Sequence, residues 1–441
     1  MITRLAERFF KIRPDEIGFV LTMGAILFMN ALTLQITNVV SISGFLNEVG
    51  ANLFIILWIV EMIVIIGTTG IHSLIVDRFD RLSLLKLISL FFAGLYLILT
   101  FMFLIGLPGW LNYSLLSLFV DQQLYFFPII YWILANDLTH PSRSIRLFPV
   151  IASFGIMGDI AGLGISAGAP GVLAGLALPN TTLLILVIIA YLGIFVVSSG
   201  LNKIPRREVQ RQHETVRETL KEGRGFVQDV PAFRYLMFSL FIIAAVMTII
   251  EYHFLALSES SYQSIDQFQT FYSVVFLIQT IVAIVVQSLL TSRIINWLNL
   301  KNTFLLMPAT ALFVTIVGMI FPGIVSATSG YLMAKLVLNG IDDTSRKSLQ
   351  AFVPEERRGR VSLFMDSYLY ASGVILGSII LGFTLIVSGG IASSTYIIIG
   401  ILLSALALNW ILRMRRSYDA SLFNWRLKRR QHMSSILDKL G

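Results

Sequence analysis

Ionisable side chains interrupt several long apolar runs of this 441-residue sequence. Four stand near the middle of a run and two nearer to an end: Glu61, Asp121, Asp159 and Lys335, then Glu251 and Asp366. Ionisable groups are almost never fully buried unless they are paired. A buried carboxyl group can take up or release a proton, and a buried ammonium group can bind an anion. These residues are therefore the candidate chemistry of the chain.

Lys335 is the first candidate because it is an isolated ammonium group within an apolar run. It can bind an anionic group of a ligand, or it can be released from Asp121 when a ligand or a proton arrives. A permanent structural ion pair between the same two residues is the alternative. For Glu61 the alternatives are a protonation site and a hydrogen-bonded packing carboxyl.

Further polar residues follow helical spacing along the same runs. The residues predicted to bind a small-molecule substrate are Lys335, Asp121, Gln122, Tyr125, Asn30, Asn339 and Glu251. The residues predicted to couple binding to proton movement are Glu61, Asp159 and Asp366.

Catalysis and metal binding find no support in the sequence. The five histidines are scattered and show no metal-ligand spacing: His72, His140, His213, His253 and His432. Glu251 and His253 are two residues apart, so on a helix they do not face each other. The chain contains no cysteine, which excludes disulfides and thiolate sites. We therefore expect neither an enzyme nor a metal site nor a cofactor.

The composition places these residues in a membrane. Hydrophobic residues make up 56% of the chain and charged ones 13%, whereas soluble domains contain roughly 25% charged residues. Mean hydropathy is +0.81. Runs of spanning length, about 20 residues each, are expected at 17–40, 51–76, 82–106, 110–135, 147–168, 181–202, 233–256, 268–292, 302–321, 325–341, 361–387 and 391–412. The predicted fold class is an all-α polytopic membrane protein with twelve transmembrane helices.

The connections between these runs alternate in charge. One set contains no lysine or arginine, and the opposite set contains nearly all of the residues that make the net charge +8. By the positive-inside rule, both termini and the connection at 203–232 are predicted to be cytoplasmic. The net positive charge is therefore explained by the orientation of the chain in the membrane, and no nucleic-acid partner is expected. We predict a multi-pass protein of a bacterial inner membrane, with the bilayer and a small molecule as partners; the oligomeric state stays open.

The chain divides into five predicted regions: an interfacial segment at 1–16, a six-helix bundle at 17–202, a cytoplasmic linker at 203–232, a second six-helix bundle at 233–412 and a basic cytoplasmic tail at 413–441. Within the tail, 417–441 is expected to lie on the membrane surface. Asn136-Asp137 ends the fourth run as Asp342-Asp343 ends the tenth, each followed by basic residues. The runs that come next are rich in glycine, which indicates close helix packing. Corresponding features in two halves indicate a parallel repeat.

This arrangement resembles the major facilitator superfamily. Asp77-Arg78-Phe79-Asp80-Arg81 is similar to its D-R-x-G-R signature, with Asp80 where that family prefers glycine, and the stretch 354–361 is similar to its common approach to the eleventh span. The resemblance implies a pseudo-twofold fold of six plus six helices and transport by rocking of the halves. It also implies cytoplasmic gating ion pairs, for which the candidates are Asp77, Arg78, Arg81, Asp137, Arg146, Asp343 and Arg346.

A narrower resemblance covers about thirty residues of the first half. The stretch 131–139 together with Arg146-Leu147-Phe148 is similar to the F-W-x-x-A-N-E-x-T and K-R-F motifs of the ATP/ADP translocases, the NTP/NDP exchange family. It implies a secondary transporter, with nucleotide or organic phosphate exchange as one possible activity. Lys335 against five intramembrane acids opposes a polyanionic substrate. The alternatives are a proton-coupled facilitator for amphipathic or cationic substrates or lipids, and a transport-inactive scaffold of the same fold.

Overall fold

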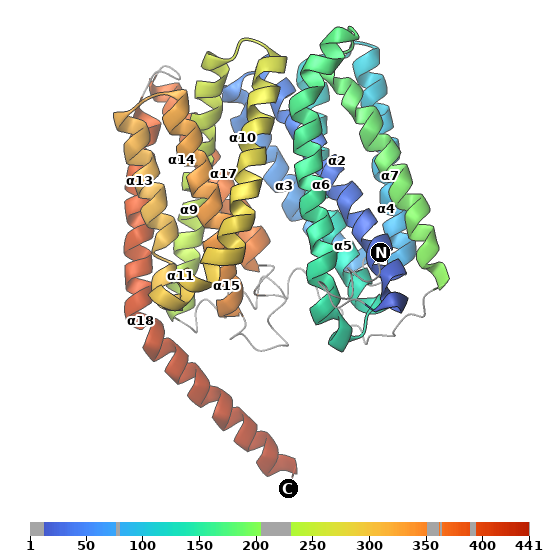
Figure 1. Ribbon diagram of the computed structural model, residues 1–441. Helices are drawn as coiled ribbons and strands as arrows, with labels where there is room; N and C mark the ends of the chain where they lie inside the picture. Colours follow the sequence, from blue (N-terminus) through green and yellow to red (C-terminus); the bar gives the residue numbers. More distant parts are fainter. Residues whose placement is uncertain are drawn as a thin grey trace. The chain divides into compact units, whose positions relative to one another are not determined.

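The computed structural model describes residues 13–75, 80–203, 231–350, 361, 364–388 and 394–440. Most of the predicted interfacial segment, Asp77 and Arg78, nearly all of the linker and the stretch 354–360 lie outside these residues. The described residues form helices and connecting turns, with no strand among them (Figure 1).

The first half of the chain contains η1 (Pro14–Glu16), α2 (Ile17–Glu48), η2 (Ala51–Leu53), α3 (Phe54–Ile75), α4 (Arg81–Leu104), α5 (Gly109–Leu138), α6 (Pro141–Gly175), η3 (Asn180–Thr182), α7 (Leu183–Ser199) and η4 (Gly200–Lys203). The second half contains α9 (Pro231–Ser261), α10 (Ile265–Val285), η5 (Val286–Leu290), α11 (Thr291–Leu298), α12 (Leu300–Thr303), α13 (Leu306–Ile320), α14 (Ile324–Leu336), η6 (Val337–Asp342), α15 (Asp343–Gln350), η7 (Phe364–Leu369), α17 (Tyr370–Ser388) and α18 (Thr395–Leu440). Three short elements, η5, η6 and η7, are π-helical.

Within the part of the chain that the structure describes, twelve helical segments are long and apolar enough to cross a membrane. The predicted all-α class with twelve transmembrane helices is confirmed. Several helices are longer than predicted. The first, α2, continues to Glu48, and the hydroxyl groups of Thr33 and Thr37 donate to carbonyls within it. It ends before Gly50, whose φ of +96° suits glycine.

The basic tail continues the helix of the twelfth span. Span twelve and the tail form one helix, α18, which runs on to Leu440 (Figure 1). The reason is local, because residues 401–440 contain neither glycine nor proline and nothing in them stops a helix. That the tail lies on a membrane surface stays a prediction.

The helices form two compact units, and each unit takes residues from both halves of the sequence. Unit 1 comprises 1–50, 70–213 and 259–281, and unit 2 comprises 51–69, 214–258 and 282–441. In unit 1, Pro170 of α6 has no N–H for the carbonyl of Ser166, and Gln269 Nε2 of α10 donates to that carbonyl at 3.1 Å. In unit 2, Tyr252 of α9 donates to Asn52 Oδ1 at 2.7 Å. The predicted division into bundles at 17–202 and 233–412 stays a prediction.

Glycines bring one pair of helices into close contact in each unit. A Cβ atom at Gly158 or Gly162 of α6 would lie 2.3 Å from the carbonyl oxygen of Phe28 or 2.7 Å from that of Leu32, both in α2. The same spacing recurs in α17, where a Cβ atom at Gly373 would lie 2.5 Å from Phe241 O and one at Gly377 would lie 2.7 Å from Ala245 O. Since helices in lipid associate mainly by packing, these contacts confirm the predicted role of the glycines.

Replacing Gly158 by alanine should therefore destabilise unit 1. The added methyl group overlaps a backbone oxygen, so α6 must move away from α2 at a cost of about 1–3 kcal/mol. Gly164→Ala is the matched control, because nothing lies within 4 Å of a Cβ atom at that position of the same helix. We expect a lower melting temperature in detergent for Gly158→Ala alone. Equal melting temperatures of the two variants would contradict the proposed contact.

Candidate functional site

Three of the chemistry-bearing residues of unit 2 lie together on α9 and α14. Tyr331 Oη donates to Glu251 Oε1 at 2.5 Å. The ammonium group of Lys335, one turn beyond Tyr331, lies 4.8 Å from the centre of the Tyr331 ring, within cation–π range. The carboxylate of Glu251 is near enough to act electrostatically on Lys335. Lys335 and Glu251 are each half-buried. The sequence candidates Lys335 and Glu251 thus share one polar site, joined by a tyrosine.

The phenol ring of Tyr331 is held by packing as well as by its hydrogen bond. The ring is buried and stacks on Phe254 with a centroid distance of 5.0 Å. Phe254 belongs to α9, as does Glu251. Since both contacts join α14 to the same helix, Tyr331 fixes the position of Glu251 relative to Lys335.

A second cluster of unit 2 is centred on Arg346 of α15. Its guanidinium group contacts Asp342 Oδ2 at 3.0 Å, Asp366 Oδ1 at 3.0 Å and Asp343 Oδ1 at 3.4 Å. Asp342 is buried, and Gln350 Nε2 donates to Asp366 Oδ2 at 3.4 Å. The structure therefore brings the gating candidates Asp343 and Arg346 together and adds Asp366, predicted as a proton-coupling residue, to the same ion pair network.

Both carboxylates that contact Arg346 at 3.0 Å belong to π-helical segments. Asp342 ends η6, and Asp366 lies in η7. A π-helical turn is uncommon and is frequent at functional sites, because it widens the helix and changes the direction of its side chains. Asn339, predicted to bind substrate, is exposed on η6. Hydrophobic periodicity did not predict these π-helical segments, because one additional residue in a turn hardly changes the apolar pattern of an α-helix.

Unit 1 contains a different pair of ionic contacts. Arg81 Nε lies 3.6 Å from Asp137 Oδ2, so two gating candidates are paired. Asp80, which stands where the facilitator signature prefers glycine, accepts hydrogen bonds from the backbone N–H of Ser83 at 3.0 Å and from its hydroxyl group at 2.8 Å. The departure from the signature thus caps the first turn of α4. Asp77 and Arg78 of the same turn lie outside the described residues.

Arg146, the remaining gating candidate, pairs with a residue that sequence reasoning missed. Its Nη2 donates to Glu16 Oε1 at 2.6 Å, and the Nε of Arg143 lies 3.9 Å from the same oxygen. The backbone N–H of Arg13 donates to Glu16 Oε2 at 3.0 Å. Burial raises the pKa of Glu16, but these hydrogen bonds and the arginine charges outweigh it and hold the pKa below its ordinary value of 4.5. Glu16 therefore joins the start of α2 to α6 as a carboxylate.

The intramembrane acids of unit 1 lie in different surroundings. Asp159 accepts a hydrogen bond from Gln35 Nε2 of α2 at 2.9 Å, beside the glycine contact between α2 and α6. Asp121 and Tyr125 are half-buried on α5. Gln122, also on α5, has both polar side-chain atoms covered, and neither has a hydrogen-bond partner among the described residues.

In unit 2, Glu61 is 5% exposed on α3.

Asn30 lies in a closed hydrogen-bond network. Gln123 Nε2 donates to Asn30 O at 3.2 Å and to Thr33 Oγ1 at 2.9 Å, and Tyr96 donates to Gln123 Oε1 at 2.8 Å. Tyr191 Oη lies 3.4 Å from Asn30 Oδ1. All five residues are buried. Such a satisfied network rigidifies a bundle, and the predicted role of Asn30 in substrate binding stays a prediction.

No model of a known protein family matches the sequence, and no curated protein matches it. Solved structures do match in fold. A bacterial homologue of the human lysosomal transporter Spinster, inward-facing and unoccupied, has 14% identity and a TM-score of 0.57, with 94% of this chain and 98% of that chain covered. The nucleoside transporter NupG has 12% identity and a TM-score of 0.61, with 90% and 98% covered. A bacterial homologue of the iron transporter ferroportin, inward-facing, has 12% identity and a TM-score of 0.61, with 92% and 100% covered.

The fold is that of the major facilitator-type transporters. Together with the twelve spans, the match makes this chain an integral, multi-pass membrane protein. All three matched proteins are transporters and none is an enzyme by its description. Identities of 12–14% carry the fold alone. The narrower resemblance to the ATP/ADP translocases finds no support in these comparisons.

The contacts of Glu16 predict a pH-dependent contribution to stability. Because the folded-state pKa is lowered, the contribution is present above the ordinary value of 4.5 and is lost as the pH falls through the folded-state pKa. Glu16→Gln should therefore lower the melting temperature at pH 7, and the difference from wild type should shrink as the pH falls from 4.5 through the lower folded-state pKa.

Arginine variants provide the control for this prediction. Arg143→Gln should have a small effect, because its side chain is 51% exposed and 3.9 Å from Glu16, whereas Arg146→Gln should reproduce the loss seen with Glu16→Gln. Thermal unfolding of purified protein across this pH range measures all three variants. A Glu16→Gln effect that stays constant with pH would overturn the assignment.

Proposed function

We propose that the protein is a secondary transporter that moves a small solute across the membrane by alternating access. The site formed by Glu251, Tyr331 and Lys335 carries the proposal. A charged side chain in the middle of a bilayer costs about 2.5–3.5 kcal/mol on insertion scales, so such residues mark ion and substrate paths by default. The facilitator-type fold supports the same conclusion, since the matched chains are transporters.

The arrangement of the site supports coupling between binding and charge. Tyr331 donates to Glu251 and presents its ring to Lys335, so the two charged groups share one neighbour. A proton on Glu251 removes the negative charge that Lys335 senses, and an anionic group of a solute at Lys335 competes with Glu251. Each event changes the free energy of the site, which is what a coupled transporter requires.

The charges of the site favour a neutral, cationic or amphipathic solute over a polyanion. The ammonium group of Lys335 is already attracted by Glu251, and the neighbouring Tyr331 and Phe254 offer stacked rings. NupG, one of the matched structures, is described as a nucleoside transporter. A neutral nucleoside therefore belongs in the substrate panel, beside cationic amphiphiles and lipids.

Nucleotide or organic phosphate exchange is the second candidate, and it rests on the resemblance of residues 131–139 and 146–148 to the ATP/ADP translocases. The surroundings of these residues favour packing over binding. Tyr131 is buried and donates to Met23 O at 2.7 Å. Arg146 is engaged by Glu16. If none of the solutes in the panel is transported, the alternative is a transport-inactive scaffold of the same fold.

The ionic contacts at Arg81, Arg146 and Arg346 are proposed to act in gating. Their loops belong to the basic set, which the positive-inside rule assigns to the cytoplasm. Arg81 pairs with Asp137 within unit 1, and Arg346 gathers three carboxylates within unit 2. Because breaking a buried ion pair leaves an uncompensated charge, such contacts can hold one conformation until binding supplies the free energy to leave it.

Lys335→Ala should abolish substrate-dependent counterflow in proteoliposomes. Loss of a hydrogen bond to a charged group costs about 1.5–3 kcal/mol, which is about tenfold or more in binding. Asp121→Asn should also abolish counterflow, as the sequence predicts. Lys301→Ala is the control, since Lys301 pairs with Asp419, whose side chain is 73% exposed. Normal transport by both Lys335→Ala and Asp121→Asn would show that the site is wrongly assigned.

Glu251→Gln tests coupling separately from binding. The amide still accepts a hydrogen bond from Tyr331 but cannot exchange a proton in the physiological range. Accumulation driven by an imposed pH gradient should therefore be lost, while counterflow at equal pH persists. Glu259→Gln, at an exposed position of the same helix, should retain both activities. Unchanged pH-driven accumulation by Glu251→Gln would remove Glu251 from the coupling mechanism.

A further inference from the structure

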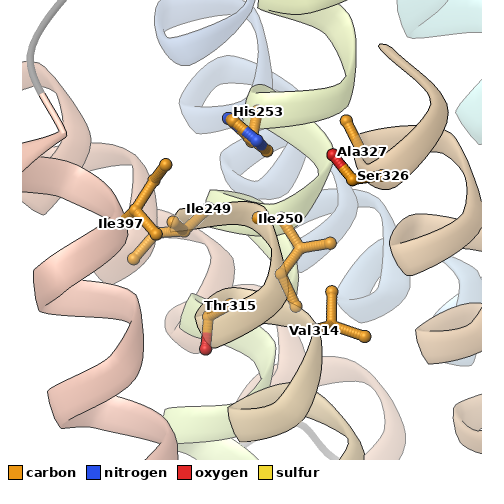
Figure 2. Close-up of a pocket in the computed structure, with 9 residues that line it drawn as sticks. Ile249, Ile250, His253, Val314, Thr315, Ser326, Ala327 and Ile397 are labelled. Carbon is orange, nitrogen blue, oxygen red and sulfur yellow. The ribbon is translucent and has the colours of Figure 1, made fainter. Parts of the chain in front are cut away.

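A small cavity lies within unit 2 among α9, α13, α14 and α18 (Figure 2). Its lining residues are Ile249, Ile250, His253, Val314, Thr315, Gly318, Ser326, Ala327 and Ile397. The cavity volume is about 20 Å³, and a site needs roughly 10–15 Å³ on this measure to hold one water molecule. The lining is mostly aliphatic, so its few polar atoms decide whether the space is dry.

The imidazole of His253 is only half satisfied by the described residues of unit 2. Its Nδ1 lies 2.9 Å from the hydroxyl oxygen of Tyr396, and the rings are 5.9 Å apart. Its Nε2 is covered from solvent and has no hydrogen-bond partner among the described residues. Leaving a buried nitrogen unpaired is unfavourable, and an ordered water molecule is a common solution. Whichever ring nitrogen holds the proton, a water molecule can pair with Nε2, because it both donates and accepts.

The space beside Nε2 exists because residue 318 has no side chain. A Cβ atom at Gly318 would lie 3.4 Å from His253 Nε2 and 3.6 Å from His253 Cδ2. Gly318 is part of the regular helix α13 and shows no positive φ, so its backbone conformation does not require glycine. The glycine instead keeps open the volume into which the free nitrogen can bond.

Ser326 provides a second polar partner. Its hydroxyl group donates to the carbonyl of Phe321, and it lies 2.9 Å from the carbonyl oxygen of Gly323, so the lone pairs of its oxygen remain available. Figure 2 shows this oxygen directed towards the side of the cavity where His253 lies. The hydroxyl of Thr315 points away from His253 in the same view, in keeping with its bond to Ala311 O at 2.8 Å.

We propose that the cavity is a binding site for a single water molecule, held between His253 Nε2 and Ser326 Oγ and admitted by Gly318. The water joins α9 to α14, the two helices that also meet through Glu251 and Tyr331. It is thus a second polar connection between the helices that carry the proposed transport site. His253 acts here as a structural acceptor or donor and not as a ligand of the solute.

Gly318→Ala tests the site, because the added methyl group occupies the position of the water and leaves Nε2 unpaired. We expect its melting temperature in detergent to fall by a few degrees. Gly67→Ala is the matched control, since Gly67 is also a helical glycine of unit 2 and nothing lies within 4 Å of a Cβ atom there. An unchanged or raised melting temperature for Gly318→Ala would overturn the proposal, because that is the result of filling a dry cavity.

Hydroxyl-radical footprinting of the wild-type chain by mass spectrometry gives a second measurement that needs no stable variant. Radicals formed from a bound water should modify the cavity residues, above all His253, whose Nε2 is covered from solvent. Ser326→Ala, which removes one partner and leaves the cavity open, should reduce this modification. Absence of modification of the cavity residues in the wild-type protein would overturn the proposal by itself.

Discussion

Backbone-to-backbone contact at two glycine pairs is the constraint on which the arrangement of the helices depends. Lipid tails are as apolar as leucine, so burying apolar side chains does little to hold two helices together inside a membrane. Close approach at Gly158 and Gly162 instead fixes α6 against α2, and the same spacing at Gly373 and Gly377 fixes α17 against α9. At each position the nearest atom to an added Cβ is a main-chain carbonyl oxygen, which cannot turn aside as a side chain can.

The polar residues take their positions from these contacts. Asp159 follows Gly158 directly, and the short distance between α6 and α2 lets Gln35 reach its carboxylate. In unit 2, Gly377 packs against Thr248, one turn before Glu251 on α9. The rotation of α9 that this contact sets is the rotation that directs Glu251 towards Tyr331. The packing of small residues therefore also determines where the charged side chains lie in this fold.

Much of the architecture could be predicted from the sequence, because a bilayer leaves few alternatives. Spanning length predicted the helices, and the glycines predicted close packing of the runs that contain them. The facilitator resemblance made Asp343 and Arg346 gating candidates, and the structure pairs these two residues. Pairs distant in sequence could not be predicted. Glu16 and Arg146 are 130 residues apart, and nothing in either local pattern refers to the other. The π-helical segments could not be predicted either, because hydropathy does not show which carbonyl accepts the hydrogen bond of each backbone N–H.

The electrostatic influence of Glu251 on Lys335 is the basis of the proposed transport site, whatever the solute. A solute or a proton that engages one group therefore changes the state of the other. Tyr331 strengthens the link, because its hydroxyl group contacts the carboxylate and its ring contacts the ammonium group. In the proposed mechanism, such a site responds to binding by a change in charge balance, because charge inside a membrane is costly enough to select between conformations.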